Sequence, residues 1–201
     1  MAKANWVKTD KTSGSGNATV NVSSTTEHTG RLPRTAILTF KAANVEDVVR
    51  QVSQAGTPEY VDIDDAASAD MAGKIVTISG VSNSKKLTFS LGTGNLVDIT
   101  LPSTYIANSV STNNGANING DPGAISEYNF SIAITVPANN SITAKTRQII
   151  VTDEGGHQDV CLLTSAAGDA YITITEGNIE LDYKGTAVTV EVKSNTTWTI
   201  E

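Results

Sequence analysis

The chain repeats itself at a distance of 112 residues, as from Asn17 to Asn129, and this repeat constrains the fold more than any other feature. The same shift places Val20 and Val22 on Ile132 and Ile134, so one alternation of apolar and polar residues recurs. Further identical pairs are Asp47 and Asp159, Val48 and Val160, Asp70 and Asp182, Gly73 and Gly185, Ser82 and Ser194, and Asn83 and Asn195. Long internal repeats usually reflect duplicated structural units. The chain therefore divides into a partial unit (1–56), a whole unit (57–168) and a second partial unit (169–201).

The two ends of the chain read as one continuous motif. Residues 193–201 contain Ser194-Asn195 followed by Trp198, and residues 5–17 continue with Trp6 and a Ser-Gly-Ser-Gly-Asn run. This order resembles the BACON family of immunoglobulin-like β-sandwiches. The resemblance implies an all-β fold with two immunoglobulin-like, BACON-type sandwiches, one of them split between the N- and C-terminal segments.

The resemblance also gives each part of the repeat a structural role. Residues 1–56 are expected to form the C-terminal half of a BACON-like sandwich, 57–168 a complete sandwich with an Asn/Gly-rich loop insertion, and 169–201 an N-terminal half. Because exposed strand edges invite pairing, 169–201 should complete 1–56, either in the same chain or in a neighbour by strand exchange, which would make a homo-oligomer. The side chains expected to carry this completion are Val188, Val190, Val192, Trp198, Ile200 and Trp6.

Composition excludes several classes of function. With 39% hydrophobic and 5% aromatic residues, the cores must be thin, which suits sandwiches whose inner faces need only every second residue apolar. A net charge of −7 argues against binding to the phosphates of nucleic acid. No apolar run approaches the roughly 18 residues of a membrane span. The single cysteine, Cys161, cannot form an internal disulfide and is expected to be a buried thiol.

Strand patterns occur throughout the chain. Alternation of apolar and polar residues is typical of a strand with one solvated face. Stretches that fit are 18–23, 35–40, 45–52, 74–78, 86–91, 130–136, 148–152, 158–164 and 186–192. The whole unit departs from this pattern at 109–123, a long Asn- and Gly-rich segment. We interpret it as a loop, either a contact surface or a mobile connection.

The sequence offers no recognisable catalytic constellation, so no enzyme activity, metal or cofactor is predicted. His28 and His157 fall in separate turns. The acidic stretch 62–65 has carboxylates that suit Ca²⁺ but lacks the glycine and distal glutamate of an EF-hand loop, and a solvated strand end is favoured. Trp6 and Trp198 could stack on sugar rings if exposed, but packing in or near the core is favoured by their positions in the family pattern.

The resemblance also suggests two functions. BACON modules are named for presumed carbohydrate binding, and many occur in secreted or surface proteins of gut Bacteroidetes; they also occur in virion proteins of crAss-like phages. The N-terminal Met-Ala-Lys-Ala-Asn has no apolar stretch of a secretion signal. We therefore expect a virion protein assembled in the host cytoplasm, an auxiliary or decoration protein bound to the major capsid protein or another virion protein. The alternative is a non-catalytic carbohydrate-binding module that adheres to glycans.

Two elements are candidates for partner contact because they add surface without serving a core. One is the basic arm 29–34, where two arginines stand out on an acidic protein, and the other is the segment 109–123. Plain surface turns remain an alternative for both. The residues assigned to partner contact are Arg31, Arg34, Asn113, Asn114, Asn117, Asn119 and Asp121.

Overall fold

The computed structural model describes residues 3–201, and its regular structure there consists of strands without helices. No helix in this range has the length and apolar character needed to cross a membrane. The strands are β1 (Val7–Thr9), β2 (Val22–Ser24), β3 (Arg34–Phe40), β4 (Val48–Gln54), β5 (Val61–Ile63), β6 (Ala66–Ala69), β7 (Lys74–Ser82), β8 (Leu87–Gly94), β9 (Thr104–Ala107), β10 (Val110–Asn113), β11 (Tyr128–Val136), β12 (Lys145–Asp153), β13 (Gln158–Ser165), β14 (Ile172–Ile174) and β15 (Val192–Ser194). The predicted all-β fold is confirmed.

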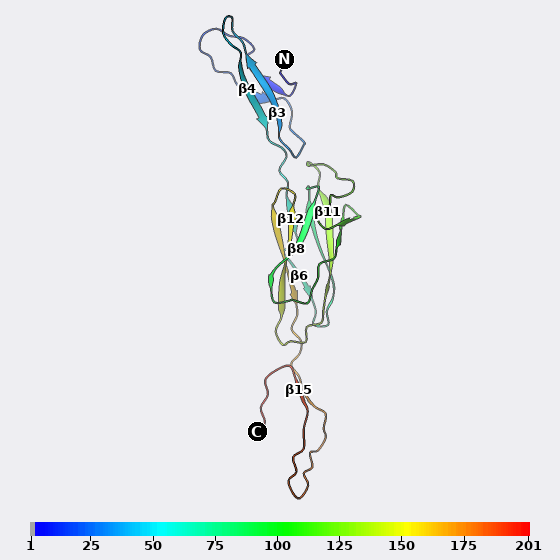
Figure 1. The fold of residues 1–201 in the computed structure, drawn as a ribbon. Helices are drawn as coiled ribbons and strands as arrows, with labels where there is room; N and C mark the ends of the chain where they lie inside the picture. Colours follow the sequence, from blue (N-terminus) through cyan, green and yellow to red (C-terminus); the bar gives the residue numbers. More distant parts are fainter. Residues whose placement is uncertain (1–2) are drawn as a thin grey trace.

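Residues 57–168 form a β-sandwich in the middle of the molecule, called here the central sandwich (Figure 1). One sheet has the order β10-β9-β11-β7-β5 and the other has the order β6-β13-β12-β8. All neighbours are antiparallel except β6 and β13. Every second residue of β11 points into the core, which is the burial pattern of a strand between a partner sheet and solvent. The core includes Ile63, Val76, Ile78, Leu87, Phe89, Tyr105, Phe130, Ile132, Ile134, Ile149, Val151, Cys161 and Leu163.

The residues on either side of the central sandwich form only two-stranded sheets. In the N-terminal segment (3–56) β1 pairs with β2 and β3 pairs with β4, while in the C-terminal segment (169–201) β14 pairs with β15. The two segments extend from opposite ends of the central sandwich (Figure 1). Among the described residues, neither segment supplies a strand to the other's sheets.

Most of the expected strands are present. For two of the expected stretches the prediction is wrong over most of their length. Of the stretch 18–23 only the part from Val22 is a strand, and of 186–192 only Val192 is, at the start of β15. A regular strand needs hydrogen-bonded neighbours along its whole length, and these stretches have short partners only, β1 and β14. The expected strand 45–52 is also shifted, since β4 begins at Val48.

The segment 109–123 is less of a loop than its composition indicates. Val110–Asn113 is strand β10, which forms a hairpin with β9. Ile118 is buried in the core, and Asn117 forms an isolated bridge with Lys86. Interpreting the entire segment as a loop is therefore wrong, because it is anchored by backbone pairing and by one apolar side chain.

A single repeat period of 112 residues is also wrong in detail. Ser82 and Ser194 are equivalent at a shift of 112. Their strand partners, Val61 in β5 and Ile172 in β14, are equivalent at a shift of 111. The C-terminal segment therefore has one extra residue between these two points, because Val61 and Ser82 are 21 positions apart and Ile172 and Ser194 are 22. The identical residue pairs in the sequence did not indicate this change of shift, because structural equivalence is defined by the register of the paired strands.

Candidate interaction surfaces

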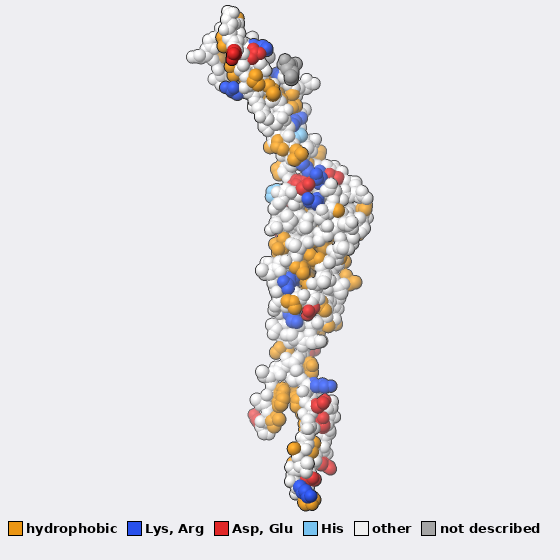
Figure 2. All heavy atoms as spheres, viewed as in Figure 1, with side chains coloured by type: hydrophobic (Ala, Val, Ile, Leu, Met, Phe, Trp, Pro, Cys, Tyr) orange, Lys and Arg blue, Asp and Glu red, His pale blue; other side chains and the backbone are white. Residues whose placement is uncertain are grey.

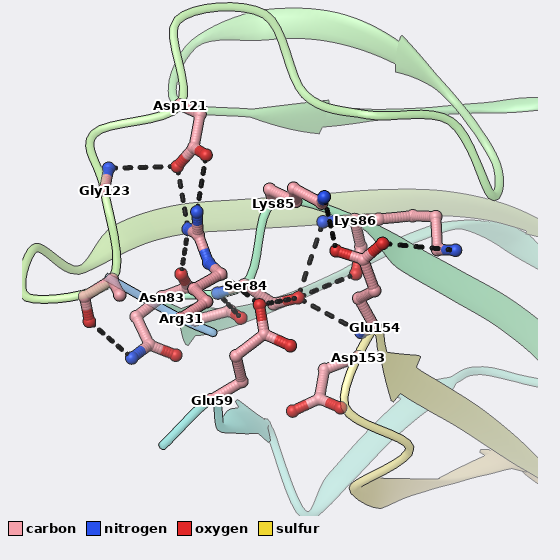
Figure 3. Close-up of polar contacts among 12 residues, drawn as sticks. Arg31, Glu59, Asn83, Ser84, Lys85, Lys86, Asp121, Gly123, Asp153 and Glu154 are labelled. Carbon is pink, nitrogen blue, oxygen red and sulfur yellow. Dashed lines mark hydrogen bonds and ion pairs between the residues drawn. The ribbon is translucent and has the colours of Figure 1, made fainter. Parts of the chain in front are cut away.

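Arg31 lies at the junction between the N-terminal segment and the central sandwich (Figure 3). Its Nη1 and Nη2 donate to Oδ2 and Oδ1 of Asp121 at 2.7 and 2.8 Å, a bidentate pair. Nη2 also donates to the backbone carbonyl of Asn83 at 2.6 Å. Nε lies 2.8 Å from Oε1 of Glu59 as an ion pair without hydrogen-bond alignment. We call Arg31, Glu59, Asn83 and Asp121 the junction clasp.

The junction clasp is shielded and electrostatically matched. The side chains of Arg31 and Glu59 are 17% and 10% exposed. The hydrogen bond between Arg31 and Asp121 raises the pKa of the guanidinium above its ordinary value and lowers the pKa of the carboxyl group. The neighbouring bond from Thr57 N to Gly30 O, 2.9 Å long, continues the link through the backbone. The clasp therefore fixes how the N-terminal segment leaves the central sandwich.

Two of the residues assigned to partner contact, Arg31 and Asp121, are thus brought together inside one chain. Their assignment to an external partner stays a prediction, and the guanidinium is occupied in this structure. Glu59 and Asn83 were missed by sequence reasoning. Nothing in the local pattern marks Glu59, whereas the repeated Ser-Asn pair at Ser82 and Asn83 was a usable signal.

Arg34 lies away from the clasp and packs on an aromatic ring. Its guanidinium carbon is 4.7 Å from the ring centre of Trp6, a cation–π contact. Its Nε donates to Oε1 of Gln54 at 2.9 Å, and Nη2 donates to the carbonyl of Thr26 at 3.0 Å. Trp6 is itself half-buried.

The asparagines of 109–123 differ in their surroundings. Asn114 joins the segment to β8, because its Oδ1 accepts from Phe89 N at 2.7 Å and its Nδ2 donates to Phe89 O at 3.0 Å. Asn113, Asn117 and Asn119 are exposed. The exposed three remain available to a partner, while Asn114 holds the segment in place.

Exposed large apolar side chains occur along the whole molecule, as Figure 2 shows in orange, and for its length the C-terminal segment carries the most of them. Those of the N-terminal segment are Val22, Leu32, Ile37, Phe40, Val45, Val48 and Val49, and those of the C-terminal segment are Tyr171, Ile172, Ile174, Ile179, Leu181, Tyr183, Val188, Trp198 and Ile200. Contiguous apolar surface of this kind marks interaction sites. The N-terminal segment holds two two-stranded sheets and the C-terminal segment holds one, and β14 is exposed along its whole length.

The side chains expected to complete a sandwich differ in exposure. Val190 and Val192 are half-buried, whereas Val188 and Ile200 are exposed. Trp198 is 46% exposed, so the expectation that its ring packs in a core is wrong for the single chain. Trp198 lies beyond the end of β15, and among the described residues no further strand joins the two-stranded sheet of β14 and β15.

The remaining candidates have local structural roles. Asp64 at the acidic stretch accepts from Ser79 N at 2.8 Å. Nδ1 of His157 lies 2.8 Å from Oδ2 of the buried Asp153 and ties the turn between β12 and β13. Within residues 3–201 no group of three or more His, Cys, Asp or Glu side chains is placed to hold a metal. Cys161 is buried, and burial raises the pKa of its thiol to about 11.

Comparisons with known proteins give one family match. The BACON family, described as "Putative binding domain, N-terminal", matches residues 1–55. No curated protein matches the chain. Among solved structures the chain is similar to the cadherin-like domains 1 to 4 of zebrafish RET, with 13% sequence identity and a TM-score of 0.30. That match covers 69% of this chain and 34% of the RET chain, so this chain spans about a third of that structure's length. The family likeness therefore lies in the N-terminal segment, one of the two segments that expose large apolar side chains.

Proposed function

We propose that this chain is a non-catalytic structural protein that binds other proteins through its β-sandwich surfaces, as an auxiliary or decoration protein on a phage capsid. The observation that carries the proposal is the number of exposed large apolar side chains on the two terminal segments. Exposed apolar surface suits protein contacts rather than small ligands. A capsid repeats its subunits many times, so modest contacts suffice through avidity.

The phage assignment follows from the resemblance to BACON-containing virion proteins of crAss-like phages. It is tested by mass spectrometry of density-gradient-purified particles of the phage that encodes the chain, with immunogold labelling of the same particles. We expect the chain at a fixed ratio to the major capsid protein and label on the heads. Its absence from particles, with the chain remaining in the soluble lysate, would contradict the assignment.

The second candidate function is carbohydrate binding. It is favoured by the match to a binding-domain family and by the exposed ring of Trp198, which could stack on a sugar. A glycan array probed with the full chain decides between the candidates. If a glycan is bound, Trp198→Ala should abolish the signal, while Tyr183→Ala, at an exposed ring on the same segment, is the matched control.

A further inference from the structure

The C-terminal segment reproduces the first strands of the central sandwich. β14 pairs with β15 as β5 pairs with β7, so Ile174 faces Val192 where Ile63 faces Gly80. All three residue pairs of β14 and β15 follow this register. These three residue pairs are therefore already arranged as in the central sandwich, and among the described residues no further strand joins them.

Hydrogen bonds of the repeated Ser-Asn pair support the same equivalence. Oδ1 of Asn195 accepts from Tyr171 N at 3.0 Å, as Oδ1 of Asn83 accepts from Tyr60 N at 2.8 Å. The serine before each asparagine donates to the carbonyl of the same tyrosine, at 2.9 and 2.6 Å. The two Ser-Asn pairs therefore correspond in structure as well as in sequence.

Among the described residues, β15 lacks the second neighbouring strand that its counterpart β7 has. In the central sandwich β7 lies between β5 and β11, and the counterpart of β11 in the repeat is the stretch 16–24 of the N-terminal segment. Val188 is 48% exposed while its counterpart Val76 is 6% exposed. Val22 is 42% exposed while its counterpart Ile134 is fully buried. In the central sandwich Val76 and Ile134 lie side by side in one sheet and are buried, whereas Val188 and Val22 in the corresponding stretches are exposed.

The two stretches also match in size. In the central sandwich the large Phe130 faces Gly80, and a Cβ on this glycine would lie 2.4 Å from the ring. In the terminal segments the large and small residues are on the opposite strands. The small Ala18 is the counterpart of Phe130, and the larger Val192 is the counterpart of Gly80. A large side chain thus meets a small one in both pairs.

Charge favours the same pairing. Residues 3–56 hold seven basic and four acidic side chains, a net charge of +3, and residues 169–201 hold six acidic and two basic side chains, a net charge of −4. A groove of about 260 Å³ in the N-terminal segment is lined by Val20, Leu38 and Phe40 together with Lys3 and Lys11. The net negative charge of residues 169–201 complements the lysines of this groove.

We propose that residues 169–201 of one copy complete residues 3–56 of a second copy by strand exchange, which forms a sandwich shared by two chains. The register of β11 and β7 places Val22 opposite Val188 and Val20 opposite Val190. Because the two segments leave opposite ends of the central sandwich (Figure 1), the contact is heterologous and adds copies head to tail. The inference names a second copy as a partner in the proposed protein-binding role and does not depend on the phage assignment.

Disulfide trapping tests the register. On the outer face, Thr19 and Glu191 take the places of Ser131 and Ser79, which face each other. We would mix Thr19→Cys and Glu191→Cys chains that carry tags of different mass, and oxidise them. The control replaces the second chain by Ala187→Cys, four residues or about 13 Å along the strand, beyond the roughly 7 Å that a disulfide can span. Native Cys161 is buried and serves as the shared background.

We expect the matched pair to give at least about tenfold more mixed dimer than the control pair. Equal cross-linking of both pairs, or none, would overturn the proposal. A chain carrying both Thr19→Cys and Glu191→Cys that closes on itself as a monomer would overturn it too, because the N-terminal segment would then be filled by its own chain.

A second measurement does not require a new bond. Val188→Asp should leave the single chain folded, because Val188 is already half exposed, yet weaken head-to-tail association by at least about tenfold in sedimentation velocity. Val97→Asp, at a 64% exposed site of the central sandwich, should change nothing. An unmodified chain that stays monomeric up to high micromolar concentration would refute strand exchange and leave the capsid role to be judged separately on purified particles.

Discussion

Gly80 and Phe130 face each other across β7 and β11 at a spacing that leaves no room for a Cβ atom on the glycine. Such an atom would lie 2.4 Å from Cζ of the ring and 2.3 Å from the carbonyl oxygen of Asp62 in β5. The ring, 2% exposed, occupies the volume that a side chain at position 80 would need. The glycine therefore allows β5, β7 and the ring to pack together.

Gly80→Ala should lower the free energy of unfolding of the central sandwich by about 1–3 kcal/mol, because one of the two clashes is with backbone that cannot rotate away. Urea denaturation measures it as a lower midpoint at constant slope. Gly177→Ala is the matched control, since a Cβ there would meet nothing within 4 Å. Equal midpoints for the two variants would show that β5 can shift to admit the methyl group.

Asn83→Ala should destabilise the same sandwich through lost hydrogen bonds rather than lost volume. The buried amide donates to the carbonyls of Pro58 and Ala124 at 2.9 and 2.7 Å and accepts from Tyr60 N. Removing it leaves these backbone groups without a partner, at a cost of about 1–3 kcal/mol. Thermal unfolding measures the loss against the exposed Asn119→Ala. A melting temperature unchanged from that control would mean that water replaces the amide.

The long strand β11 could be predicted from sequence because the alternation over 130–136 has little competing explanation. The three- and four-residue strands β5, β6, β9 and β10 could not, since alternation over so few residues is indistinguishable from chance. The terminal stretches 18–21 and 186–191 carry a clear strand pattern and still are not strands. An alternation of apolar and polar residues indicates which side chains could face a core. A regular strand also requires a neighbouring strand to hydrogen-bond with.

Some residues of the candidate site could likewise be predicted from the sequence and others could not. Arg31 could be singled out because it is a cation on an acidic chain, but its partners could not, since Glu59 and Asp121 lie 28 and 90 residues away with no periodic relation to it. Trp198 was assigned to a core by its place in the family pattern. That assignment assumed a completed sandwich, whereas the described residues of one chain leave the ring 46% exposed.

Arg31→Ala should loosen the junction without unfolding the central sandwich. Loss of the guanidinium leaves the 10% exposed Glu59 and the Asp121 carboxylate unpaired, and removes charge-assisted bonds of about 1–3 kcal/mol. Hydrogen exchange at the Thr57 amide, which is bonded to Gly30 O, should quicken, while exchange at β7 amides stays unchanged. Lys41→Ala, which breaks an exposed pair with Asp47, is the control and should leave Thr57 protected. Unaltered exchange at Thr57 would mean that the backbone alone holds the junction.

Acid should open the junction through Asp121. The hydrogen bond from Arg31 lowers the pKa of this carboxyl group in the folded junction below its ordinary value of 3.8. The closed junction therefore binds fewer protons than the open one, and its stability rises with pH. The contribution is present in full above the ordinary pKa and is lost as the pH falls through the lowered one.

The carboxyl carbon shift of Asp121, followed by NMR as the pH is lowered, should have its midpoint below 3.8. In the Arg31→Ala chain the midpoint should return toward the ordinary value, because the first cause of the shift is gone. Lys41→Ala should leave the Asp121 midpoint where it is. The Thr57 amide shift should move over the same pH range in the parent chain but not in Asp121→Asn, where no proton is taken up. A Thr57 titration that persists in Asp121→Asn would assign the acid response of the junction to another carboxylate, with Glu59 the first to replace by glutamine.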